Sequence, residues 1–142
     1  MRLAPPLALA LPLVSALTAG VLLILQVVLM LRVVLARRAA RQSLGTGNDD
    51  RLLRAVRQHG NLAENAGIFV TGLALLEMLG ERRSVLAVLC AAFVVARVAH
   101  VVGLSMKNTV NRARVLGVAA TATVGITVGF RLVAIAIRHL SG

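Results

Sequence analysis

Three polar side chains of complementary chemistry share one stripe of a single predicted helix. Arg57, Asn61 and Glu64 stand at positions i, i+4 and i+7, so all three point to the same side of an α-helix. A guanidinium group binds a carboxylate through two parallel hydrogen bonds, and a carboxylate accepts an ammonium group. His59 lies roughly 200° around the helix from Arg57 and is expected to face a different neighbour. The stripe therefore suits a ligand that carries both acidic and basic groups.

Arg97 and His100 form a second polar pair, at positions i and i+3 on one face of a later apolar run. A lone Arg near the end of a membrane helix often extends its side chain to the headgroups, but here a second polar group shares the face. Ionisable groups that persist inside a membrane usually face a cavity. With a further Arg to favour a thiolate over a thiol, the set matches a ligand with two carboxylates, one ammonium group and a thiol.

Four long apolar runs must position these residues. They span about 11–35, 61–79, 85–104 and 115–137, and each has the roughly 20 residues that cross a bilayer as a helix. Hydrophobic residues make up 58% of the 142 residues and the mean hydropathy is +0.88, well above soluble domains, which are about 45–50% apolar. The sequence predicts an all-α membrane protein, a four-transmembrane-helix bundle in one domain over residues 1–142. The first run exceeds the hydrophobic part of a signal peptide and is predicted to be a retained span.

The net charge of +11 is distributed as in a multi-pass membrane protein. Eight basic residues lie in the first and third connections and four lie on the opposite side, which predicts that these connections are cytoplasmic and both termini outside. The chain has three Phe and neither Trp nor Tyr to stack on bases, so no nucleic acid partner is expected. The single cysteine, Cys90, is expected to serve in packing, and no metal site is predicted.

At these residues the chain resembles the MAPEG family, the membrane-associated proteins of eicosanoid and glutathione metabolism, and looks closest to their bacterial members. The resemblance rests on the four spans, the Arg37-Arg38 end of the first, the Arg57-x-His59-x-Asn61-x-x-Glu64 motif and Arg97-x-x-His100. It implies a homotrimer in a bacterial inner (plasma) membrane that binds glutathione as a co-substrate between neighbouring subunits. The glutathione-contacting positions that it implies are Arg37, Arg57, Asn61, Glu64, Arg97 and His100.

The resemblance also implies that an Arg at the start of the fourth helix activates the glutathione thiol. Arg112 and Arg114 both fit this position, and Arg114 is preferred because it adjoins the apolar span. The function implied is that of a glutathione transferase or peroxidase acting on a lipophilic small molecule dissolved in membrane lipid.

Two other functions compete with this one. A non-catalytic lipid- or ligand-binding scaffold of the same fold is favoured by the absence of Tyr, because the family places Tyr where this chain has Asn65, Val102 and Leu104. Gly67 also stands where a helix-kinking Pro is usual. A small drug exporter would need a membrane carboxylate that cycles its proton, but the dense Arg cluster near Glu64 should keep that carboxylate ionised.

Other polar and small residues have expected structural roles. Those near the outer ends of the spans are predicted to be interface anchors or structural ion pairs: Glu77, Glu81, Arg82, Arg83 and Arg131. The pair Gly125 and Gly129 predicts that the fourth helix packs closely inside the bundle or at a subunit contact. Arg32 lies deep in the first span, and the sequence offers no explanation for it.

Overall fold

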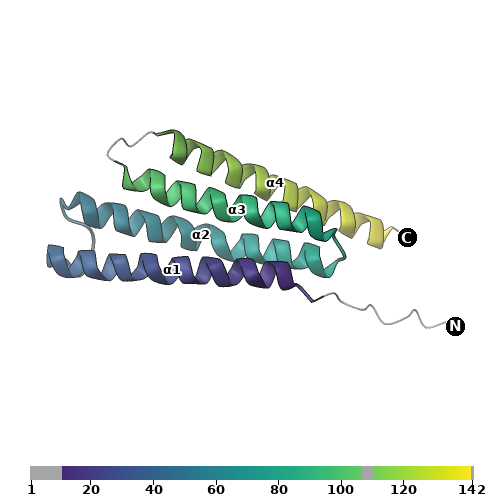
Figure 1. Cartoon of the computed structure of the whole chain (residues 1–142), viewed down its shortest axis with the longest axis horizontal. Coiled ribbons are helices and arrows are strands. Elements are labelled where there is room, and N and C mark those ends of the chain that lie inside the picture. The colour runs from purple at the N-terminus through teal and green to yellow at the C-terminus, as the bar shows by residue number, and fades with distance from the viewer. Residues whose placement is uncertain (1–10, 107–110, 142) are drawn as a thin grey trace.

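Four long helices account for nearly all of the chain in the computed structural model, which describes residues 11–106 and 111–141. They are α1 (Leu13–Ala40), α2 (Asp50–Met78), α3 (Arg83–Ser105) and α4 (Arg112–Leu140). Figure 1 shows them lying side by side in an up-and-down arrangement, with the α1–α2 and α3–α4 connections at one end and the α2–α3 connection at the other. The prediction of an all-α, four-helix fold is confirmed. The Arg-rich α1–α2 connection therefore lies at the same end of the bundle as the end of α3 and the start of α4.

Three of the helices, α1, α3 and α4, are long and apolar enough to cross a membrane. The helix α2 has 29 residues, which is also long enough, but it carries the polar residues of the Arg57 stripe and ends at Glu77 and Met78. These residues lower its hydropathy below that of the other three. A membrane crossing by α2 therefore stays a prediction.

The helices extend beyond the apolar runs, most of all at the start of α2. This helix begins at Asp50, whereas the apolar run begins near residue 61. Asp49 is its N-cap, and the Asp49 carboxylate accepts a hydrogen bond of 2.9 Å from the Leu52 backbone N–H. Counting apolar residues detects the hydrocarbon-facing part of a helix, but the backbone remains helical as far as its cap. As a result, Arg54 and Arg57 lie on a regular helix.

The core lies along α2 and α3, because each of these two helices contacts all three of the others. Over the described residues, α1 and α4 make no contact with each other. Phe93 is fully buried and its ring stacks on Phe69 with 4.3 Å between ring centroids. Cys90 is buried in the same cluster, as expected for a packing role. The outer faces of α1 and α4 are covered with exposed apolar side chains, which is the pattern of helices that face lipid.

Small residues allow α4 to approach its neighbours closely. A Cβ atom on Gly117 would lie 2.9 Å from the Ala96 carbonyl oxygen, and one on Gly125 would lie 2.9 Å from the ring of Phe69. Gly129, by contrast, faces open space. Of the predicted pair, Gly125 packs within the bundle and Gly129 does not.

The acidic residues near the outer end form structural contacts. The Glu77 carboxylate accepts hydrogen bonds from the backbone N–H groups of Val14 and Ser15, at 2.9 and 2.8 Å, and from the Ser15 hydroxyl at 2.7 Å. Glu77, in the last turn of α2, therefore caps the start of α1. The N-cap residue of α1 itself, Pro12, supplies no side-chain hydrogen bond. Glu81 pairs with Arg131 at 2.5 Å. The prediction of structural roles is confirmed for these residues.

The Glu81 pair predicts a loss of stability in acid. The hydrogen bond from Arg131, together with the one from the Arg82 backbone N–H, holds the pKa of Glu81 below its ordinary value of 4.5. A carboxyl group with a lowered folded-state pKa stabilises the fold above its unfolded-state pKa, and this contribution is lost as pH falls through the folded-state value. The melting temperature should fall as pH drops below 4.5. Arg131→Gln should make that fall shallower; an identical pH profile for the variant would contradict the assignment.

Candidate functional site

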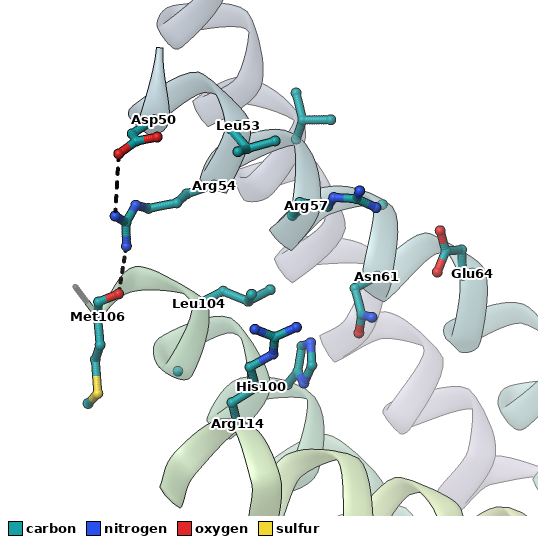
Figure 2. A pocket seen from close by; sticks show the side chains of 13 residues that line it. Asp50, Leu53, Arg54, Arg57, Asn61, Glu64, His100, Leu104, Met106 and Arg114 are labelled. Atoms are coloured by element: carbon teal, nitrogen blue, oxygen red, sulfur yellow. Dashed lines mark hydrogen bonds and ion pairs between the residues drawn. The ribbon is translucent and has the colours of Figure 1, made fainter. Parts of the chain in front are cut away.

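A cavity of about 700 Å³ opens between α2 and the facing ends of α3 and α4. Figure 2 shows its walls, with the α2 side chains facing those of α3 and α4 across the cavity. Its polar lining residues are Asp50, Arg54, Arg57, Asn61, Glu64, His100 and Arg114. The volume falls within the range of about 300–1,000 Å³ typical of small-molecule sites.

The wall formed by α2 is the predicted stripe. Arg57, Asn61 and Glu64 all line the cavity, at successive turns of the helix (Figure 2). Arg54 lines it as well and was not among the predicted site residues. Its position three residues before Arg57 places it on the same stripe, so the spacing alone was sufficient to find it.

The opposite wall brings His100 and Arg114 together. His100 is buried, and its Nδ1 atom has no hydrogen-bond partner among the described residues. Asn111 holds the start of α4 against α3: its side-chain amide donates to the Gly103 carbonyl at 2.7 Å, and its oxygen accepts from the Arg114 backbone N–H at 2.9 Å. A Cβ atom on Gly103 would lie 2.7 Å from that Arg114 nitrogen. The position of Arg114 therefore depends on close packing between α3 and α4.

Arg97 lies behind this cavity rather than in it. Its guanidinium group is 3% exposed and donates to Asn61 Oδ1 at 2.9 Å, to the Gly117 carbonyl at 3.3 Å and to the Thr121 hydroxyl. It lines a separate, smaller cavity of about 450 Å³ between α2 and α4. Arg97 thus fixes the Asn61 side-chain oxygen, so its direct influence is on the orientation of a predicted ligand-contacting amide.

The two remaining predicted residues also lie away from the cavity in this chain. Arg37 donates to the backbone carbonyls of Gln42, Ser43 and Gly45, at 3.4, 3.2 and 3.0 Å, and so stabilises the α1–α2 connection. Arg112 is the first residue of α4 and does not line the cavity, whereas Arg114 does. Of the two predicted Arg residues at the start of α4, Arg114 is therefore the one that faces the cavity.

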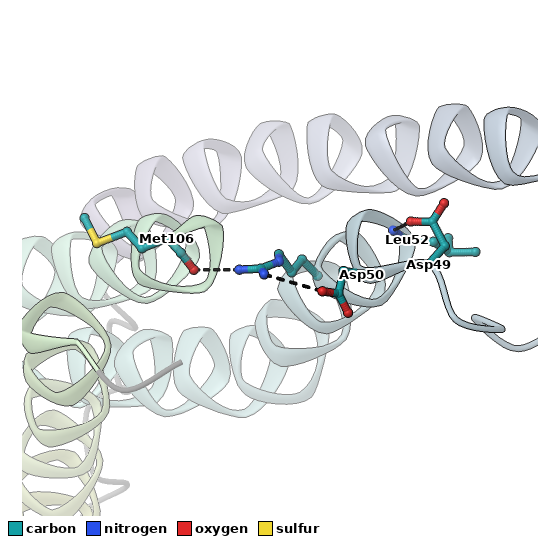
Figure 3. A network of polar contacts seen from close by, with 5 residues as sticks. Asp49, Asp50, Leu52 and Met106 are labelled. Carbon is teal, nitrogen blue, oxygen red and sulfur yellow. Dashed lines mark hydrogen bonds and ion pairs between the residues drawn. The ribbon is translucent and has the colours of Figure 1, made fainter. Parts of the chain in front are cut away.

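Arg54 connects the end of α2 to the end of α3. Its guanidinium group donates to the Met106 carbonyl oxygen at 2.6 Å and lies 3.9 Å from the Asp50 carboxylate. Figure 3 shows this chain of contacts between Asp50 and Met106. The contacts tie the first turn of α2 to the end of α3 and hold the Arg54 side chain in place.

The charges that line the cavity are three guanidinium groups and two carboxylates, hence one net positive charge. The Asp50 carboxylate pairs with Arg54, and the other charged residues that line the cavity are Arg57, Arg114 and Glu64. Two cations and one anion complement a ligand with two carboxylates and one ammonium group. Such a ligand carries one net negative charge, which balances that of the cavity.

Comparison with models of known protein families yields a match. The model of the MAPEG family matches residues 15–134, which include all of α2 and α3, most of α1 and α4, and every polar residue that lines the cavity. No curated protein matches the chain.

Proposed function

The chain belongs to the MAPEG family of membrane proteins, and we propose that it is a glutathione transferase or peroxidase acting on lipophilic electrophiles. The observation that carries the proposal is the convergence of Arg57, Asn61 and Glu64 with His100 and Arg114 on one cavity. The charges of these residues match the two carboxylates and the ammonium group of glutathione. The protein would work as an integral membrane protein of the bacterial plasma membrane, with the cavity on the cytoplasmic side and both termini outside.

Each residue has a distinct part in the proposed mechanism. Arg57 binds a glutathione carboxylate, Glu64 accepts the ammonium group, and Asn61, held by Arg97, orients the backbone of the tripeptide. The thiol loses its proton to solvent water, and Arg114 stabilises the thiolate that remains. The thiolate sulfur then forms a bond with an electrophilic atom of the lipophilic acceptor, and the leaving group departs with the electron pair. Proximity of the two bound reactants supplies most of the rate advantage.

One chain alone leaves the site open to its surroundings. Arg57, Glu64 and Arg114 are exposed in the single chain, while Arg37, a predicted ligand contact, lies on the α1–α2 connection. A homotrimer would supply the missing wall, with each glutathione held between neighbouring subunits. Exposed apolar side chains on α1 and α4 provide surface both for subunit contacts and for lipid.

Glutathione binding tests the proposal through Glu64. Titration calorimetry should show binding to the wild-type protein, and Glu64→Gln should weaken it by roughly 10- to 100-fold because a charge-assisted hydrogen bond to the ammonium group is lost. The matched control is Asp49→Asn, which removes the same charge outside the cavity and keeps an N-cap residue. Equal affinity in wild type and Glu64→Gln would contradict the proposed orientation of glutathione.

A non-catalytic membrane scaffold is the second candidate. The absence of Tyr favours it, since the cavity has no phenolic hydroxyl group to donate to the tripeptide or its sulfur. Failure of the purified protein to bind glutathione in the same calorimetric experiment would establish this alternative over the first.

A further inference from the structure

A separate cavity of about 380 Å³ lies where α1, α2 and α3 meet at the end that carries the Arg-rich connections. Its charged lining residues are all basic: Arg32 from α1, and Arg51 and Arg54 from α2. Arg54 also borders the larger cavity, but Arg32 and Arg51 do not. Arg32, for which the sequence offered no explanation, therefore has a defined place in the fold.

Two of the three basic residues, Arg32 and Arg51, have no carboxylate partner in the described part of the chain. The chain has five acidic residues, and all five are within the described part. Their positions are elsewhere: Asp49 caps α2, Asp50 pairs with Arg54 outside this cavity, Glu64 lines the larger cavity, Glu77 caps α1 and Glu81 pairs with Arg131. Among the described residues, Arg32 and Arg51 have neither an ion pair nor a side-chain hydrogen bond. Arg32 and Arg51 are exposed in the single chain and line the same cavity, so a bound anion can supply their counter-charge.

A buried polar side chain, that of Gln58, also lines this cavity. Gln58 is 1% exposed, and its side-chain amide donates to the Val101 carbonyl at 2.8 Å and to the Ser105 hydroxyl at 2.7 Å. The Gln58 side-chain oxygen is buried and has no hydrogen-bond partner in the described structure. This oxygen can accept a hydrogen bond, and a hydroxyl group on a bound molecule would donate one.

The location of the cavity indicates lipid as the source of the anion. Arg32 lies eight residues before the end of α1, which corresponds to about 12 Å of helix, and is thus within reach of the headgroup level. Beside it, Leu35 lines the cavity and is 63% exposed on the apolar face of α1. The guanidinium groups therefore adjoin a surface suited to an acyl chain. Basic pockets between membrane helices on the cytoplasmic side are known to hold anionic lipid headgroups.

We propose that this cavity binds the phosphate group of an anionic phospholipid with a hydroxylated headgroup, held by Arg32, Arg51 and Arg54. Guanidinium groups contact the phosphate oxygens, the Gln58 oxygen accepts from a headgroup hydroxyl, and an acyl chain lies along the exposed apolar face of α1. The site is distinct from the proposed glutathione cavity. The lipid phosphate supplies a negative charge beside the basic residues where the three helices meet.

The test is native mass spectrometry of the full-length protein in neutral detergent, titrated with phosphatidylglycerol. Wild type should retain the lipid, whereas Arg32→Gln/Arg51→Gln should bind it about a hundred-fold more weakly, because two charge-assisted contacts are lost. The matched control Arg38→Gln/Arg41→Gln removes the same charge from the same end of α1 without touching the cavity. It should stay within about threefold of wild type, because exposed charges are screened over about 8 Å at physiological salt.

Two further ligands separate the sources of the phosphate. Phosphatidylcholine, which has a phosphate but no net charge, should bind poorly, and millimolar inorganic phosphate should fail to displace phosphatidylglycerol. Displacement by inorganic phosphate would overturn the assignment to lipid in favour of a soluble phosphate compound. Equal retention of phosphatidylglycerol by wild type and Arg32→Gln/Arg51→Gln would overturn the site itself.

A second variant tests the site independently, in case the first variant fails to fold. Ala36→Glu introduces a carboxylate within the cavity wall and should displace phosphatidylglycerol while leaving the protein folded, whereas Ala39→Glu on the exposed side of α1 should not. Retention of the lipid by Ala36→Glu at wild-type affinity would count against the proposal. Glutathione binding should be unchanged in Arg32→Gln/Arg51→Gln, so failure of the lipid site and failure of the proposed function would be told apart.

Discussion

Replacing Arg114 by Ala is expected to remove most of the thiolate signal of bound glutathione and to slow transfer to a lipophilic electrophile by about 10²- to 10³-fold. This magnitude is typical when one preorganised group that stabilises developing or resident negative charge is deleted. Arg114 is the basic residue at the start of α4 that lines the larger cavity, where it lies beside His100 (Figure 2). Thiolate absorbance during titration with glutathione, together with single-turnover rates, measures both effects.

Arg112→Ala is the matched control for this prediction. It removes the same charge two residues earlier in α4, outside the cavity, and should leave the thiolate signal near that of wild type. A thiolate signal that Arg114→Ala leaves unchanged would remove Arg114 from the mechanism. Glutathione that binds to wild type entirely as the thiol would favour the non-catalytic scaffold instead.

Glu77→Ala is expected to destabilise the protein by about 3 kcal/mol, because the change removes three hydrogen bonds to a charged acceptor. It also leaves the first turn of α1 without its cap. For a chain of this size the melting temperature should fall by roughly 10 °C. Cys90 offers a convenient readout, because this buried thiol reacts with a fluorescent maleimide only as the helices separate.

Glu81→Ala serves as the comparison for Glu77→Ala. Both changes remove a carboxylate near the outer end, but the partner of Glu81 is Arg131, whose side chain is 43% exposed. The exposure of Arg131 lets solvent screen this ion pair, and Glu81 lacks the contacts that cap a helix, so the melting temperature should fall less than for Glu77→Ala. Equal melting temperatures for Glu77→Ala and wild type would show that α1 does not depend on this cap.

Much of the fold and half of the site could be predicted from local sequence patterns. Apolar runs long enough to cross a bilayer predicted four helices, because a helix in lipid needs about 20 apolar residues whatever its neighbours are. The stripe of Arg57, Asn61 and Glu64 followed from helical periodicity alone, since the spacing of side chains around a helix is fixed by its geometry. Both properties depend only on residues within a few turns of one another. The apolar run at 61–79 marks only part of α2, because the polar first turns of the helix carry no hydropathy signal.

Tertiary structure decided where the remaining polar groups act. Arg97 shares a helix face with His100, yet only His100 lines the cavity, because the close approach of α4 at Gly117 places Arg97 against Gly117, Thr121 and Asn61. Glu77 caps a helix whose first turn is 62 residues away in the sequence.

The grouping of Arg32 with Arg51 likewise required the structure, since it joins two different helices. Sequence by itself determined which residues lie on the same side of each helix and which segments are apolar. Tertiary structure determined which of those sides face each other, because the rotation and separation of packed helices depend on contacts between residues far apart in the chain.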